Sequence, residues 1–97
     1  MIVCLGTFTR PIGEGDADVI AEHHAFIDAR LASGELVCSG PRIPATGGLI
    51  IFRGTDPAVA REVLNADPLV RDGVATYDIT AFRATTAVDA AFSEAPG

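Results

Sequence analysis

Lysine is absent from this chain, and its seven basic residues, all arginine, are outnumbered by thirteen acidic residues. The formal net charge is -6, and no segment forms a basic stripe that could neutralise phosphate groups. The composition therefore argues against nucleic acid as a partner.

Long apolar runs are also absent. No segment approaches the roughly 20 consecutive apolar residues that a helix needs to cross a bilayer. The first ten residues, MIVCLGTFTR, have neither a basic leading segment nor a cleavage site typical of a secretory signal. We therefore expect no contact with a membrane and a cytoplasmic location.

Cysteine is scarce, with only Cys4 and Cys38, and no CxxC pair. Each lies in an apolar run that is typical of a strand, where a thiol behaves as a small hydrophobic group. No charge pattern that would activate a thiol lies nearby, so we expect structural roles for both.

Several motifs of enzyme chemistry are missing as well. The chain has no serine or cysteine nucleophile with a credible base, no phosphate-binding loop despite ten glycines, and no GxGxxG segment. His23 and His24 are adjacent, and neighbouring helix residues point about 100° apart, whereas a shared metal needs a spacing of three or four residues. We expect no metal, nucleotide or flavin cofactor.

The 97 residues are 48% hydrophobic, enough for one domain with a small core. Residues 2–8 form an apolar run that predicts a strand, and a loop rich in glycine follows. Asp16 or Asp18 can cap a helix over about residues 17–33, and Gly34 supplies its left-handed stop.

The second half of the chain repeats this alternation of strand and helix signals. Pro41 must lie at a strand end or edge, whereas the more continuous run after Gly47 is typical of the centre of a sheet. Two Asp-Pro pairs each predict a helix start. The predicted elements are a strand at 35–39, a strand at 47–53, a helix at 57–65, a helical turn from Pro68 and a strand at 74–82.

The order strand, helix, strand, strand, helix, strand is that of a ferredoxin-like α+β fold, with two helices on one face of a four-stranded antiparallel sheet. The other face needs a cover, and a second copy packed face to face is the simplest one. We expect a homodimer of this dimeric α+β barrel type. Residues 1–83 form the predicted domain, and residues 84–97 a tail with at most one helical turn near 88–92.

The first predicted helix carries two polar residues on its apolar face. His23 and Arg30 lie near the centre of an arc of about 140°. An imidazole and a guanidinium are costly to bury without partners, so this face should line a pocket. The apolar residues of the arc are Val19, Ile20, Phe26, Ile27 and Leu31.

Three patches together resemble the YciI-like family, also called the YCII-related domain family, from Ile2 to about Arg83. The first is His23, followed eleven residues later by Gly34 and then by LVCSGP. The second is the glycine-led strand at 47–52, and the third is ADPLVRDGV at 66–74. The chain departs from the family at Val19, where many members have arginine, and at Leu69, where they have an aromatic residue.

The resemblance implies a ferredoxin-like fold that dimerises through its sheets, and an active site built from a histidine and an aspartate. His23 and Asp67 are the matching positions. One branch of the family is associated with removing HCl from chlorinated hydroxyquinols, which implies that the scaffold can host proton-transfer chemistry.

Each candidate residue also has an ordinary structural explanation. His23 could be a core histidine, or a base whose second nitrogen is held by a carboxylate. Asp67 could be a helix cap, the partner of His23, or both. Arg30 could bind an anionic or enolate oxygen or pair with a buried acid.

Four further residues complete the candidates. Ser39 and Arg42 flank the Gly-Pro turn and could line the mouth of the pocket and contact substrate, or could serve only the turn. His24 lies at the edge of the apolar stripe, which favours a solvated or interface ring. Tyr77 could place its hydroxyl in the cavity, although an aromatic residue on a half-buried strand needs no further reason.

These observations leave three hypotheses. In the first, the domain is a cofactor-free lyase or isomerase acting on a small aromatic or enolisable substrate through His23 and Asp67, with Arg30 or Arg42 stabilising oxyanion charge. In the second, a dimer of the same domain binds a small metabolite as a sensor or subunit without turning it over. In the third, the dimer is purely structural.

Overall fold

The computed structural model describes residues 1–89 of the chain. It has the predicted α+β architecture, with a short 3-10 turn, η1, added before the first helix. The elements are β1 (Ile2–Phe8), η1 (Glu14–Asp16), α1 (Ala17–Ala32), β2 (Leu36–Pro41), β3 (Gly48–Phe52), α2 (Pro57–Leu64), α3 (Pro68–Arg71) and β4 (Ala75–Ala81).

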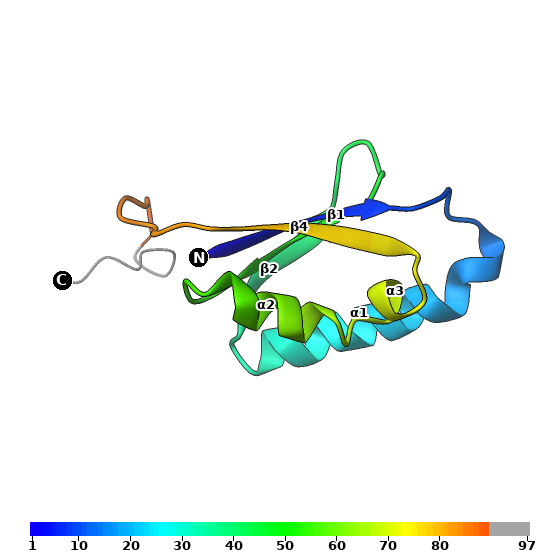
Figure 1. Ribbon diagram of the computed structural model, residues 1–97, viewed down its shortest axis with the longest axis horizontal. Helices are drawn as coiled ribbons and strands as arrows, with labels where there is room; N and C mark the ends of the chain where they lie inside the picture. The colour runs from blue at the N-terminus through cyan, green and yellow to red at the C-terminus, as the bar shows by residue number, and fades with distance from the viewer. Residues whose placement is uncertain (90–97) are drawn as a thin grey trace.

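The four strands form one antiparallel sheet in the order β2-β3-β1-β4. The most continuous apolar segment therefore lies in the interior of the sheet, as its sequence predicts. The helices α1, α2 and α3 lie on the same side of the sheet (Figure 1), and no element within residues 1–89 covers the other side.

Local sequence signals set where the helices begin and end. Asp56 and Asp67 are the N-caps of α2 and α3, and each side chain accepts a hydrogen bond from the backbone N–H of the second residue after it. Gly34 and Gly73 have φ angles of 80° and 70°, the left-handed conformation that glycine adopts most easily, and each lets the chain leave a helix for a strand.

The core lies between the sheet and the helices. Side chains at alternate positions of β1 and β3 point toward α1 and α2, as the period of two in a strand requires. A second, smaller cluster of Leu69, Val74 and Ala75 lies beside the start of α1. The main cluster contains Ile2, Cys4, Ile27, Leu36, Ile50, Phe52, Ala60, Leu64 and Tyr77.

The side chains at the remaining alternate positions of each strand point to the opposite face of the sheet. Register places Val3 beside Ile51 and Leu5 beside Leu49, so these four apolar side chains share this face, and each is only half-buried. We call this surface, formed by Val3, Leu5, Leu49 and Ile51, the open sheet face.

Two details depart from the predicted pattern. The strand predicted at 35–39 runs instead from Leu36 to Pro41, with a register shift between Leu36 and Cys38. The shift puts Cys38 opposite Ile51 and leaves it exposed, whereas Cys4 is fully buried. Part of the predicted tail, residues 90–97, lies outside the described residues, and so does most of the helical turn predicted near 88–92.

Candidate functional site

Asp67 is the one buried charged residue among those described, and its side chain is 0% exposed. Its position follows from the Asp-Pro signal, since the residue before α3 must turn its carboxylate back to cap the helix. The backbone N–H of Leu69 donates to Oδ1 at 3.0 Å, and the hydroxyl of Tyr77 donates to Oδ2 at 3.0 Å. A buried carboxylate with several donors is stable in its ionised form.

His23 reaches this carboxylate from α1. Its Nδ1 lies 2.9 Å from Oδ1 and 3.1 Å from Oδ2 of Asp67. Since an ionised carboxylate only accepts hydrogen bonds, Nδ1 must carry the proton, and the neutral ring then has its lone pair at Nε2. The site thus contains an imidazole whose tautomer and orientation are fixed by a buried acid.

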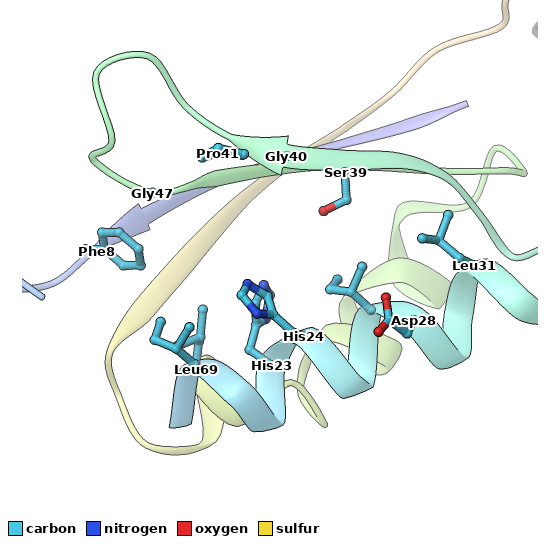
Figure 2. A pocket seen from close by; sticks show the side chains of 12 residues that line it. Phe8, His23, His24, Asp28, Leu31, Ser39, Gly40, Pro41, Gly47 and Leu69 are labelled. Carbon is cyan, nitrogen blue, oxygen red and sulfur yellow. The ribbon is translucent and has the colours of Figure 1, made fainter. Parts of the chain in front are cut away.

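The imidazole lines a cavity of about 390 Å³ between α1 and the edge of the sheet. Figure 2 shows the hydroxyl of Ser39 pointing from β2 toward the helix, on the side where His24 and Asp28 rise from α1. Most other lining side chains are apolar. The lining residues are Phe8, Ile20, His23, His24, Ile27, Asp28, Leu31, Ser39, Gly40, Pro41, Gly47 and Leu69.

Burial also changes the acidity of two groups behind the histidine. Desolvation raises the pKa of the Tyr77 phenol, and the adjacent negative charge of Asp67 raises it further. Tyr77 therefore stays protonated and remains a hydrogen-bond donor through the neutral range. Desolvation likewise raises the pKa of the Cys4 thiol to about 11, so Cys4 is no nucleophile.

Some of the residues predicted for the site lie together at the cavity, and others do not. The structure brings together His23 and Asp67, and Ser39 lines the cavity that they border. Arg30 and Arg42 are not among the described residues that line it.

Both arginines have partners elsewhere. Arg30 lies two helical turns beyond His23, and its guanidinium lies over the ring of Phe26 at 4.9 Å, a cation–π contact. Arg42 continues the alternation of β2 after Pro41 and donates to Oγ1 of Thr7 at 3.0 Å, on the open side of the sheet.

Three site features were not predicted. His24 is exposed, as expected, but it also lines the cavity. Asp28 follows His24 by four residues, a helical spacing that could have suggested a shared face. The hydroxyl of Tyr77 is bonded to Asp67 behind the imidazole and does not enter the cavity, which no local pattern could indicate because it depends on strand register.

No cluster of three or more histidine, cysteine, aspartate or glutamate side chains suited to a metal occurs within residues 1–89. Over the same part of the chain, no helix is both long enough and apolar enough to cross a bilayer.

The model of the YCII-related domain matches residues 1–83, which is most of the chain and includes every residue of the His23–Asp67 site. The protein belongs to the YCII-related domain family. This YCII-related domain matches no curated protein in sequence.

One similar solved structure is 5-chloro-2-hydroxyhydroquinone dehydrochlorinase from Burkholderia phenoliruptrix AC1100, in complex with 2,5-dihydroxybenzoquinone. The two chains are 17% identical and superpose with a TM-score of 0.66, over 86% of this YCII-related domain and 94% of the dehydrochlorinase. At this level of identity, the likeness establishes a shared fold.

Proposed function

We propose that this domain is a cofactor-free acid–base enzyme of the lyase or isomerase type, with His23 as the base and Asp67 as its partner. The observation that carries the proposal is the hydrogen bond from Nδ1 of His23 to a fully buried carboxylate, beside a cavity large enough for one small ring. A neutral imidazole held in this way has its basic nitrogen, Nε2, available for substrate.

In the proposed step, Nε2 accepts a proton from a phenol or from an acidic carbon of the substrate, and the imidazolium forms. The negative charge of the fully buried Asp67, 2.9 Å from Nδ1, stabilises that cation. In a dehydrochlorination the substrate would then release chloride and the imidazolium would pass its proton to solvent, so that the net loss from the substrate is one HCl. In an isomerisation the proton would return to another atom.

Two observations support a small aromatic or enolisable substrate. The walls of the cavity are mostly apolar, and besides His23 the polar side chains that line it are Ser39, His24 and Asp28. The dehydrochlorinase of the same fold acts on a chlorinated hydroxyhydroquinone. With Arg30 and Arg42 engaged elsewhere, we propose Ser39 as the residue that donates to a substrate oxygen.

We also propose that the domain works as a homodimer through its open sheet faces. The four half-buried apolar side chains of that face support this arrangement.

The test uses 5-chloro-2-hydroxyhydroquinone as substrate and 2,5-dihydroxybenzoquinone as a ligand that contains no chlorine to release. We expect the native protein to release chloride, and H23N to lose about 10²- to 10⁴-fold in kcat, the usual contribution of a general base. Binding of the quinone, measured by calorimetry, should change little in H23N. The comparison variant is H24N, which changes a second ring of the cavity wall but leaves the Asp67 contact intact, so it should keep a higher kcat than H23N.

The other outcomes discriminate among the hypotheses. Unchanged chloride release in H23N would exclude His23 as the base. Quinone binding by the native protein without chloride release would favour a metabolite-binding or sensor dimer. If the native protein showed no binding and no chloride release, the aromatic substrate class would be contradicted.

A further inference from the structure

The hydroxyl of Tyr77 has no part in the mechanism above, yet it is one of the most constrained polar groups of the molecule. Tyr77 is 6% exposed and donates to Oδ2 of Asp67 at 3.0 Å. It comes from β4 and is not among the residues that line the cavity, whereas His23 comes from α1 and lines it.

A glycine in the neighbouring strand leaves space for the ring of Tyr77. Gly6 lies opposite Tyr77 in the register of β1 and β4. A Cβ at position 6 would lie 2.7 Å from Cε1 of Tyr77, closer than two carbon atoms can pack. The absence of a side chain at Gly6 therefore allows the ring to reach the carboxylate.

Hydrogen bonds to Asp67 come from three separate elements. Oδ1 accepts from the backbone of Leu69 in α3, and Oδ2 accepts from Tyr77 in β4. Both oxygens lie within hydrogen-bond distance of Nδ1 of His23 in α1. Without the tyrosine hydroxyl, Oδ2 would have only the imidazole as a donor among the described residues, and the orientation of the carboxylate about its Cβ–Cγ bond would be less strongly fixed.

We infer that Tyr77 is a positioning residue for His23, acting through Asp67. Its hydroxyl fixes the plane of the carboxylate and holds charge on it, and this favours the tautomer with the proton on Nδ1 and the lone pair on Nε2. The effect of Tyr77 on catalysis rests on the proposed function, whereas its effect on the tautomer of His23 can be measured in the ligand-free protein.

The composition makes the experiment unusually clean, since Tyr77 is the only tyrosine and the chain has two histidines. The probe is ¹⁵N-histidine protein, in which long-range proton–nitrogen correlation spectra identify the protonated nitrogen of each neutral ring. In the native protein we expect His23 to be protonated at Nδ1. In Y77F, which keeps the ring and loses the hydroxyl, we expect a mixture with the Nε2-protonated form, while His24 is unchanged.

Two further proteins separate positioning from general damage to the fold. Biosynthetic replacement of the single tyrosine by 3-fluorotyrosine keeps the hydroxyl and should keep the native tautomer. G6A keeps the hydroxyl but displaces the ring, and should resemble Y77F, whereas G40A, where an added Cβ meets nothing within 4 Å, should not. A native tautomer of His23 in Y77F or in G6A would overturn the inference, so the test still decides if one of the two variants fails to fold.

The catalytic arm uses chloride release from 5-chloro-2-hydroxyhydroquinone. A positioning role predicts that kcat of Y77F falls about 10- to 100-fold while KM changes less than about twofold, since the hydroxyl does not touch the cavity. A tautomer shift in Y77F without any turnover by the native protein would contradict the proposed function and leave the positioning role standing. Turnover that depends on His23 but not on Tyr77 would support the proposed function and contradict the positioning role of Tyr77.

Discussion

Two buried weak acids, Cys4 and Tyr77, give the folded state a pH dependence in the alkaline range. Burial raises the pKa of the Cys4 thiol from its ordinary value of 9.0 to about 11. It also raises the pKa of the Tyr77 phenol above its ordinary value of 10.0, with a further contribution from Asp67. An unfolded chain releases both protons at a lower pH than the folded protein does.

The sign of the effect follows from proton counts. Below about pH 8 both groups are protonated in both states, so they add no pH dependence. Above about pH 9 the unfolded state binds fewer protons than the folded state, so the free energy of unfolding falls as the pH rises. Urea titrations followed by circular dichroism between about pH 8 and about pH 11 should show this decline.

Variants separate the two contributions. C4A should remove the decline that begins near pH 9, and Y77F the part that begins near pH 10. A free energy of unfolding in the native protein that stays flat to about pH 11 would show that neither group keeps its proton on account of burial.

At the residue scale, the parts of the site that follow local rules were the predictable ones. Asp67 could be identified as a helix cap from the proline that follows it, and His23 from its place on an apolar helix face. The positions of Arg30 and Arg42 could not be predicted in the same way, since long side chains reach partners, here Phe26 and Thr7, that only the folded chain supplies.

At the scale of elements, the four-residue helix α3 depends strongly on its N-cap, Asp67. A single helical turn has too few internal hydrogen bonds to be stable alone. Asp67 caps α3 and also joins it to α1 through His23 and to β4 through Tyr77. The salt bridge from Arg71 to Glu22, at 2.7 Å, adds a surface contact between α3 and α1.

The two Asp-Pro caps provide a matched comparison. D56A removes an exposed cap of α2 and should lower the free energy of unfolding by about 1 kcal/mol. D67A removes the same type of cap but also leaves the buried donors of Leu69, Tyr77 and His23 without an acceptor, so we expect a loss of about 3 kcal/mol or more. Urea titrations at neutral pH measure both values.

The variant D67N tests the contribution of the negative charge of Asp67 separately from that of its cap. D67N retains a capping side chain of the same size, so it should be less destabilised than D67A and still fail to hold His23 protonated at Nδ1. Equal losses in D56A and D67A would mean that Asp67 serves only as a cap.

The order and type of the elements were predictable because each start and stop has a local chemical cause, such as the Asp-Pro pairs and the positive φ angle at Gly34. The register shift in β2 was not predictable, because it depends on pairing with β3 across the sheet. Its consequence matters for function, since the alternation beyond the shift directs Ser39 toward the cavity and Arg42 away from it.

At the scale of the whole molecule, α1, α2 and α3 cover one side of the sheet (Figure 1), and within the described residues the other side carries the open sheet face. Two charges of opposite sign accompany its apolar residues. Arg42 contacts Thr7 near the end of β1, and Asp78 lies beside Leu5 in the register of β1 with β4. A two-fold axis through such a face would pack its apolar residues against the same residues of a second copy.

This arrangement predicts a particular sensitivity to substitution. The native chain should have twice the mass of one chain in light scattering at micromolar concentration. I51R places a charge in the middle of the open sheet face and should give the mass of a single chain, because an unpaired guanidinium in an apolar interface is costly. V59R, at an exposed position on α2, should leave the double mass unchanged. If I51R keeps the double mass, the dimer uses another surface, and the open sheet face must be explained without a second copy.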